Sequence, residues 1–506
     1  MAVIILSAFF LFLLTYVIQF YIHRKNIYRV REQIGLKGPR TNWLLGNLHG
    51  FIERKQTIGY DDGYNWYLEL HQKFGDTFAI FVGSLLNIIV SNEEDIKEIF
   101  VKNFSNFSDR YVPCFVEKSN LSKSLFFSTY SDGWKKCRSA ISPIFSSGSM
   151  KLMYGVVNEK VETLLSILEE KSGSREQFDI QEDFKALTLD IIAKCAFAID
   201  SNCQRDRNDE FYIHAKDFVK NIDYRHSWIT TAGMFLQELG WLWKALYRFT
   251  GMYRAETPLV KGLNDLYERR ISGKTETSEG VDLLKLMIDR NSRSSEKQIS
   301  QQEIVENCFA VLLGGYDTSS ISLSYCTYLL ARHPEVQERL YQEIKKVEKE
   351  QGINYDSILS MKYLDAVYKE NLRLYPPTFH GLIRVCLQDI TIRDQFIPKG
   401  SCVTITPYTV HRNEDNWPNA SQFQPERFLD DYTEKNSLKW IPFGVGPRIC
   451  VGMRFAEMEI KTTIVKMLER FQISMDPGEP DLVPELEGVV MQPRDPIHVE
   501  LKRRNS

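Results

Sequence analysis

The hydrophobic pattern of the chain begins with one long apolar run. Residues 3–22 are almost wholly apolar and, as a helix, long enough to cross the hydrocarbon core of a bilayer. A basic cluster follows at once, made up of His23, Arg24, Lys25, Arg29 and Arg31. Because cations beside a span favour the cytosolic side, we expect an uncleaved membrane anchor with the rest of the chain in the cytosol. A cleaved signal peptide is the alternative, but its basic start and small-residue cleavage site are missing.

Beyond this run, helical periodicity dominates and strand patterns are few. Residues 78–90 alternate around a glycine and predict a β-hairpin, and residues 488–491 and 497–501 predict short strands near the C-terminus. Helices are predicted over residues 158–247 with polar breaks near Gly173 and Asn202, and over residues 298–331, 362–375 and 453–471. The expected fold class is mostly α with a smaller β lobe.

The chain divides into three parts. Residues 1–24 are the expected anchor, and residues 25–50 combine basic residues with Gly and Pro and are expected to act as a hinge. Residues 51–506 contain no stretch rich enough in Pro, Gly or Ser to be a linker, so we expect one large folded domain there.

Composition and charge change this picture little. A formal net charge of -3 argues against nucleic acid as the main partner. The nine cysteines are scattered without CxxC pairs, which indicates reduced thiols in the cytosol.

Residues 234–243 are unusually aromatic. A buried helix is one interpretation. The other is a segment that dips into the membrane beside the anchor, where interfacial Trp would be favourable.

The strongest candidate chemistry lies in residues 442–452. Gly444, Gly446 and Gly452 allow sharp turns and a close approach to a flat group. Cys450 precedes a predicted helix, whose N-terminal N–H groups favour a thiolate over a thiol. A thiolate in such a donor-lined loop suits a haem iron. A structural cysteine in a Gly-rich turn is the alternative.

The run Phe443-Gly444-x-Gly446-x-Arg448-x-Cys450-x-Gly452 resembles the haem-binding signature of the cytochrome P450 family. The resemblance covers nearly everything from residue 35 onward, and it is closest to the animal microsomal branch that includes xenobiotic- and steroid-oxidising enzymes. It implies a haem-thiolate catalytic domain with haem b between a long distal helix and the loop of Cys450. Cys450 would be the axial ligand, and Phe443 would pack against its sulfur.

Further residues resemble the groups that hold the haem propionates in this family. Trp134 and Arg138 are four residues apart and share a helix face, although such a pair is usually one core and one surface residue. Arg110, Arg384 and Arg448 are additional candidates by similarity.

The predicted helix 298–331 carries Gly314, Gly315, Asp317 and Thr318. Paired glycines in an apolar helix let something flat lie against its backbone. The run resembles the family's oxygen-activation motif, which implies that Thr318 binds the dioxygen and Asp317 relays protons. The alternative for Thr318 is a hydrogen bond to the carbonyl four residues earlier. Some members attach haem covalently through a Glu where this chain has Gly314, so we expect non-covalent haem.

Glu370 and Arg373 lie three apart on the predicted helix 362–375, a spacing usually seen in solvated ion pairs. Together with Arg427 they resemble the family's buried Glu-Arg-Arg cluster, for which we expect a structural role.

The resemblance implies a monooxygenase of apolar small molecules, such as xenobiotics, steroids or lipids, in the endoplasmic reticulum membrane. Flavin and nicotinamide fingerprints are absent from the sequence, so electrons are expected from an NADPH-dependent flavoprotein reductase, with cytochrome b5 as a second candidate donor. Candidate contacts for a reductase are Lys135, Lys136, Lys439 and Arg454. Two alternatives remain open: a haem-thiolate isomerase or dehydratase, which the Asp317-Thr318 pair disfavours, and a haem-binding sensor without turnover.

Overall fold

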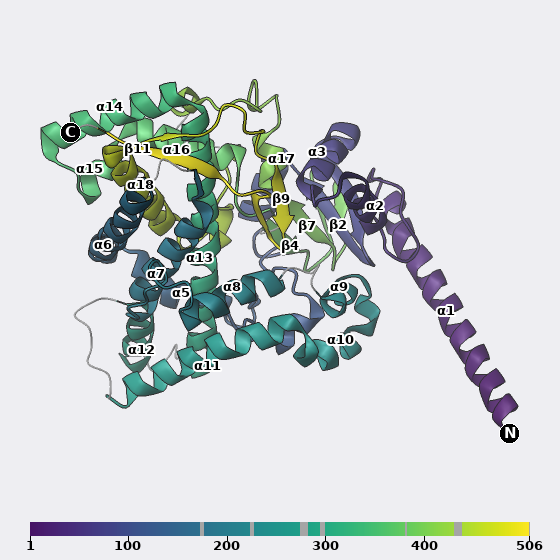
Figure 1. The fold of residues 1–506 in the computed structure, drawn as a ribbon. Coiled ribbons are helices and arrows are strands. Elements are labelled where there is room, and N and C mark those ends of the chain that lie inside the picture. Colours follow the sequence, from purple (N-terminus) through teal and green to yellow (C-terminus); the bar gives the residue numbers. More distant parts are fainter. Residues whose placement is uncertain are drawn as a thin grey trace.

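The computed structural model describes residues 1–172, 177–222, 227–273, 282–293, 299–379, 382–429 and 438–504. A large helical part and a smaller β lobe lie side by side, and one helix projects from the β side (Figure 1). The mostly α fold class with a smaller β lobe is thus confirmed.

Helices make up most of the described chain. In order they are α1 (Ala2–Gln33), α2 (Leu48–Ile58), α3 (Gly63–Phe74), α4 (Glu93–Lys97), α5 (Trp134–Ile141), α6 (Ser147–Ser172), α7 (Gln181–Phe197), α8 (Glu210–Ile222), α9 (Trp228–Phe235), α10 (Gly240–Leu246), α11 (Gly251–Ile271), α12 (Leu283–Arg293), α13 (Gln301–Arg332), α14 (Pro334–Gln351), α15 (Tyr355–Ser360), α16 (Lys362–Leu374), α17 (Pro407–His411) and α18 (Met453–Arg470). Short helical turns used below are η2 (Cys114–Lys118), η5 (Gln237–Leu239), η7 (Pro425–Phe428) and η8 (Gly446–Arg448).

The β lobe is built around a four-stranded sheet in the order β1-β2-β7-β4, in which only the β2–β7 pair is parallel. Its strands are β1 (Thr77–Val82), β2 (Leu85–Val90), β4 (Leu382–Val385) and β7 (Cys402–Ile405). The smaller sheets use β3 (Phe178–Asp179), β5 (Ile390–Ile392), β6 (Gln395–Ile397), β8 (Phe471–Ser474), β9 (Pro484–Glu487), β10 (Val490–Pro493) and β11 (His498–Arg503). The hairpin predicted over residues 78–90 is confirmed as β1 and β2.

Helix α13 runs through the main hydrophobic core and is buried over most of its length. It begins at Gln301, because Ser300 caps it and exchanges hydrogen bonds with Glu303 in a capping box. The predicted start at residue 298 lies outside the described residues. Helix α7 packs along α13, so closely that a Cβ on Gly315 would lie 2.9 Å from Ile192.

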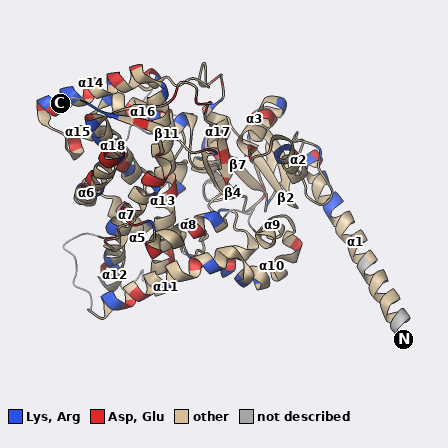
Figure 2. Ribbon diagram, viewed as in Figure 1, with Lys and Arg blue, Asp and Glu red and all other residues tan. Residues whose placement is uncertain are grey.

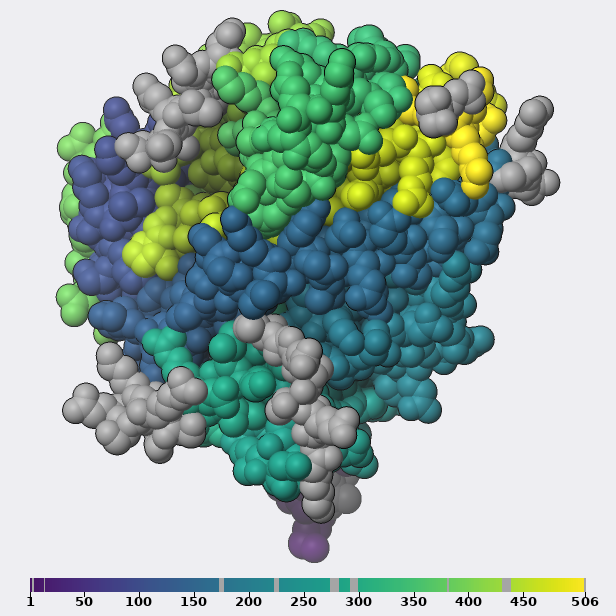
Figure 3. Space-filling view, turned by 90° about the vertical axis from the view of Figure 1, so that its left-hand side faces the viewer, coloured from purple at the N-terminus to yellow at the C-terminus, as the bar shows by residue number. Residues whose placement is uncertain are grey.

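Packing on the left-hand face of the molecule involves segments far apart in sequence. Figure 3 shows blue residues near 150–200 crossing this face, with green α14 and yellow-green C-terminal residues packed above them. Helix α18, which follows Cys450, contacts α6, α13 and α14 and is largely buried. The segment after the candidate thiolate is therefore anchored in the core.

Helix α1 is long and apolar enough to span a membrane, and the side chains described over its first 22 residues are almost all exposed. Figure 2 shows this projecting part almost free of charge, with basic residues where it reaches the body. The expected boundary at residue 24 does not coincide with a helix end, since α1 continues to Gln33. Beyond it Leu36 joins a buried cluster with β1, β2 and β7.

The aromatic segment 234–243 is not one buried helix. Helix α9 ends at Phe235, the chain turns through η5, and α10 starts at Gly240. Phe235 and Trp243 are buried, but Trp241 is 70% exposed. Each of the two short helices therefore carries one buried and one strongly exposed aromatic side chain, Phe235 and Trp228 on α9 and Trp243 and Trp241 on α10.

Candidate active site

The loop before α18 has the geometry that its glycines suggest. Gly444 and Gly446 have positive φ angles of 80° and 73°, in the left-handed region. A Cβ on Gly444 would lie 2.7 Å from Leu382, and one on Gly446 would overlap the carbonyl of Phe100. Gly452 has an ordinary φ of -89° and open space beside it, so the protein itself imposes no need for glycine there.

Cys450 is held by this loop with its side chain accessible. Its N–H donates to the carbonyl of Phe443 at 2.9 Å, and the Phe443 ring lies edge-on to Trp440. Cys450 is exposed although Arg448 and Val445 beside it are buried, so its side chain faces an opening and does not fill the core.

The helix terminus acts on the Cys450 sulfur as expected, but it is not the largest influence. The opening that Cys450 faces is surrounded by protein, so desolvation raises the pKa of the thiol, while the N–H groups of Gly452 and Met453 and the charges of Arg138 and Arg110 lower it. The helix end thus acts in the expected direction, toward the thiolate, and desolvation opposes it.

Four arginines predicted as propionate ligands gather near this loop from separate elements. Arg138 comes from α5, Arg384 from β4, Arg448 from η8 and Arg110 from the segment before η2. Their charges act on one another or on Cys450, which places them in one neighbourhood. Arg448 lies over the ring of Trp134, 4.5 Å from its centroid, so the predicted residue on α5 also belongs to the site.

The hydrogen bonds of these arginines are incomplete. Arg448 donates to the Ser128 carbonyl at 2.8 Å, and Arg138 donates to the Ile449 carbonyl at 2.7 Å. Among the described residues, Nε of Arg110, Nε of Arg384, and Nε and Nη1 of Arg448 find no acceptor. The acid paired with Arg448 is Asp109, at a distance of 4.0 Å.

Burial and mutual repulsion weaken these cations. Burial lowers the pKa of Arg110 to about 10 and that of Arg448 to about 9. It also lowers the pKa of Arg384 well below its usual range, and the charges of Arg110 and Arg448 add to that effect. Buried arginines without anions are costly, and two carboxylates would satisfy them. The residues present therefore fit a haem, whose two propionates supply that charge beside an accessible cysteine.

On α13, Thr318 and Gly314 are hydrogen-bonded to each other. The Thr318 hydroxyl donates to the Gly314 carbonyl at 2.6 Å, which is the back-bonded alternative for this residue. Its oxygen can still accept a hydrogen bond. The two glycines have different neighbours. Gly314 lies near Phe126, whereas Gly315 faces Ile192 on α7, so helix packing explains Gly315 without a flat ligand.

Asp317 is almost fully buried and turned toward charged groups of other elements. Burial raises its pKa to about 6, the cation of Lys185 on α7 lowers it, and Glu487 on β9 raises it. A carboxyl with this pKa exchanges its proton readily near neutrality, which is what a proton relay requires.

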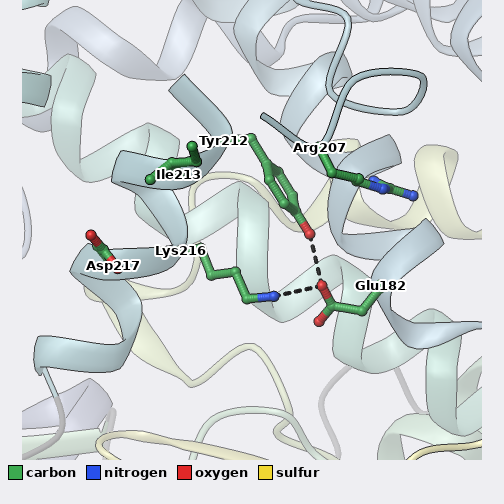
Figure 4. A pocket seen from close by; sticks show the side chains of 6 residues that line it. All are labelled: Glu182, Arg207, Tyr212, Ile213, Lys216 and Asp217. Carbon is green, nitrogen blue, oxygen red and sulfur yellow. Dashed lines mark hydrogen bonds and ion pairs between the residues drawn. The ribbon is translucent and has the colours of Figure 1, made fainter. Parts of the chain in front are cut away.

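A surface cavity of about 400 Å³, drawn in Figure 4, lies on α7 and α8 near Lys185, the residue whose charge acts on Asp317. Glu182 lines the cavity and lies 3.2 Å from Lys185. The same carboxylate accepts hydrogen bonds from Tyr212 at 2.9 Å and from Lys216 at 2.7 Å, as the dashed lines show. None of the predicted site residues lines this cavity.

Glu370, Arg373 and Arg427 form a buried cluster, and the solvated alternative for Glu370 and Arg373 is wrong. Both side chains are fully buried and joined by two hydrogen bonds of 2.6 and 2.8 Å. Arg427 in η7 lies 3.4 Å from Glu370. Arg373 also donates to the carbonyls of His411 and Ala420, which fixes the chain after α17.

Three participants were missed by sequence reasoning: Asp109 beside Arg448, Phe126 between Arg110 and Gly314, and Lys185 near Asp317. Each meets its partner across a large sequence separation. Only Asp109 had a local signal, since it adjoins Arg110.

The fold and the site define a helical haem-thiolate protein. The cytochrome P450 family model matches residues 36–501, and the chain belongs to that family. It is a P450 monooxygenase that binds haem through a cysteine thiolate.

Relatives match over nearly the whole chain. Cytochrome P450 3A16 of Mus musculus is 29% identical over 485 residues, covering 93% of this chain and 92% of the relative. Cytochrome P450 3A12 of Canis lupus familiaris is 29% identical over 502 residues, covering 96% and 94%. Cytochrome P450 3A29 of Sus scrofa is 29% identical over 504 residues, covering 97% and 96%.

Proposed function

We propose that the chain is a membrane-anchored monooxygenase that oxidises apolar small molecules, with Cys450 as the ligand of haem b. The observation that carries this proposal is the accessible Cys450 beside four arginines, three of which (Arg110, Arg384 and Arg448) have buried nitrogens without an acceptor among the described residues. When bound, the haem supplies the activation of dioxygen and the oxidation of a C–H bond.

The ligand assignment is tested by Cys450→Ala. Loss of the thiolate should abolish the red-shifted carbon monoxide band of the reduced protein. Cys137→Ala, at a buried cysteine on α5, is the matched control and should keep the band. An unchanged band in Cys450→Ala would refute the assignment.

The chain's own residues have separate tasks in this reaction. Arg110, Arg138, Arg384 and Arg448 hold the propionates, with Trp134 beneath Arg448. Asp317 takes protons from solvent and passes them on, because its pKa of about 6 suits both directions of transfer. Thr318 accepts a hydrogen bond while donating to Gly314, and so orients the proton path.

Electrons come from an NADPH-dependent flavoprotein reductase, with cytochrome b5 as a second donor. Of the candidate contacts, Lys135 is exposed, whereas Lys136 pairs with Glu303 and Lys439 with Glu93, each at 3.4 Å. Arg454 donates to Ser147 and to the Phe145 carbonyl. Lys135 is therefore the candidate most available to an acidic partner, and Lys135→Glu should slow reduction at low salt more than at high salt.

Apolar substrates reach the site from the endoplasmic reticulum membrane, with the catalytic domain on the cytosolic side. The exposed apolar stretch of α1 and the exposed Trp228 and Trp241 support this arrangement. Substrate-dependent NADPH consumption in the presence of reductase tests the proposed monooxygenase activity. Turnover of a peroxide without NADPH would indicate an isomerase or dehydratase instead, and no turnover would indicate a sensor.

A further inference from the structure

The base of the anchor helix is pinned to the aromatic segment by one buried arginine. Arg24 is fully buried, although it lies directly after the apolar stretch. Its Nε lies 2.8 Å from Oε1 of Glu238, and its Nη2 donates to Oε2 of the same carboxylate at 2.9 Å. Nη2 also donates to the carbonyl of Phe235 at 2.7 Å. One guanidinium therefore holds both the end of α9 and η5.

The Phe235–Glu238 turn is held from its other sides as well. Gly83, in the turn between β1 and β2, lies so close that a Cβ there would overlap the Phe235 carbonyl. Ser84 donates to Gln237 at 3.1 Å, and Trp243 on α10 donates to the Leu236 carbonyl at 2.7 Å. The anchor helix, the β1–β2 turn and the α9–α10 segment thus meet at one junction.

The chain after Arg24 is fixed in the same way. Tyr28 donates to the carbonyl of Gly83 at 3.1 Å, and Arg31 donates to the carbonyl of Pro39 at 2.8 Å. Leu36 is buried with the β lobe. These contacts leave little freedom for a hinge between the anchor and the folded domain.

Aromatic side chains near this junction face outward. Trp228 and Trp241 are each 70% exposed, and Phe249 is 60% exposed. Trp43 is 44% exposed and lies edge-on to Tyr21, a residue of the apolar stretch, at 5.9 Å between ring centroids. In Figure 1, α9 and α10 lie on the side of the body from which α1 projects. Because Trp and Tyr favour the membrane interface, these side chains continue the lipid-facing surface of α1.

We infer that the Arg24–Glu238 contact is a pin that locks α1, the β1–β2 turn and the α9–α10 segment into one rigid junction, so that the anchor and the catalytic domain do not pivot independently at the lipid bilayer. The Arg24–Glu238 contact sets the tilt of the catalytic domain and keeps the α9–α10 segment at the lipid surface. This inference rests on the proposed membrane anchorage. It makes the first part of the hinge expected over residues 25–50 a fixed junction.

The test uses the full chain with its haem in phosphatidylcholine bilayers. Arg24→Gln and Glu238→Gln each remove one charge of the pin. Lys25→Gln is the matched control, since Lys25 is the exposed neighbouring cation of the same basic cluster. Amide hydrogen exchange over residues 24–31 and 235–239 reports the junction, and linear dichroism of the haem in oriented bilayers reports the tilt.

We expect exchange in both segments to rise about tenfold or more in Arg24→Gln and in Glu238→Gln, because local opening becomes easier. The distribution of haem tilt should broaden in both variants. The double variant should be no worse than either single one, and the exchanged pair Arg24→Glu with Glu238→Arg should recover part of the protection. Lys25→Gln should match the wild type.

Two results would overturn the inference in different ways. If amide exchange and haem tilt are the same in Arg24→Gln as in Lys25→Gln, the anchor is a flexible tether. The proposed membrane anchorage would still hold. Failure of the wild-type chain to sediment with vesicles would instead refute the proposed anchorage itself.

Discussion

The molecule buries arginine in two different ways. Arg373 is fully buried and surrounded by acceptors: both oxygens of Glu370 and the carbonyls of His411, Ala420 and Gln422. Arg384 is equally buried, but its one recorded acceptor is the neighbouring Ile383 carbonyl, and its Nε finds none among the described residues.

The difference separates a structural arginine from one that is arranged for a ligand. Arg373 has its anion inside the protein, so its burial fixes the chain around α17 and η7. Arg384 stands beside Arg110 and Arg448, and no anion from the described residues pairs with it, so its surroundings fit the carboxylates of the proposed haem. Substitutions in the cluster of Glu370, Arg373 and Arg427 should therefore destabilise the haem-free protein. Substitutions in the cluster of Arg110, Arg384 and Arg448 should leave it equally or more stable and weaken haem binding.

The largest effect is expected from Glu370→Gln. The change leaves Arg373 and Arg427 without their anion, and losing one partner of a buried pair costs about 3–5 kcal/mol. Urea unfolding should show this loss in protein with or without haem. Glu426→Gln, at a half-exposed partner of Arg339, should cost less than about 1 kcal/mol. Equal losses in the two variants would contradict the structural role of the cluster.

The next largest effect is the pH dependence of the free energy of unfolding that Asp317 causes. The pKa of Asp317 is raised to about 6 from 3.8, so the folded protein holds this proton more tightly than the unfolded chain. Its stabilising contribution is present below pH 4 and is lost as the pH rises through 6, by on the order of 3 kcal/mol. The free energy of unfolding of Asp317→Asn should lack this dependence when compared with wild type between pH 4 and 7.

The charges around Asp317 provide a finer test. Lys185→Gln should raise the pKa of Asp317, and Glu487→Gln should lower it, since these groups act in opposite directions. Lys216→Gln is the control, because Lys216 shares the partner Glu182 with Lys185. Infrared titration of the Asp317 carboxyl band measures the shifts, and a shift in the control as large as that in Lys185→Gln would contradict the assignment.

Arg384→Met should have the signature opposite to that of Glu370→Gln. The haem-free protein should be equally or more stable, because a buried cation without an anion is removed. Haem should dissociate faster, because the variant lacks one charge-assisted hydrogen bond to the haem. The free energy of haem binding should weaken by about 1.5–3 kcal/mol. Transfer of haem to an acceptor protein measures the rate. A destabilised haem-free protein with normal haem retention would assign Arg384 a purely structural role.

The smallest effect on stability is expected at Thr318. Thr318→Ala removes a hydrogen bond to the Gly314 carbonyl and should change the free energy of unfolding by no more than about 1 kcal/mol. Product formed per NADPH should fall and peroxide should rise, whereas Thr318→Ser should keep the coupling. If Thr318→Ala forms as much product per NADPH as the wild type, the only role left for the Thr318 hydroxyl is its hydrogen bond to the Gly314 carbonyl.

Local patterns in the sequence were sufficient to predict several helices and strands and to identify the loop of Cys450. The hairpin, α16 and α18 follow from periodicity and from punctuation by Gly and Pro, because backbone preferences act over a few residues. The Cys450 loop was recognisable for the same reason, since its glycines and cysteine are spaced along one turn. The helix break after Phe235 was missed, because neither Pro nor Gly marks it before Gly240.

Only the tertiary structure decided which charges meet. Arg448 with Asp109, Asp317 with Lys185, and Arg24 with Glu238 join segments that lie far apart in the sequence. Spacing along the chain carries no record of such contacts, because they arise from the packing of whole helices and sheets against one another. For the same reason, the sequence identified the arginines of the site, while the fold determined which of them had an anion and which were left to bind one.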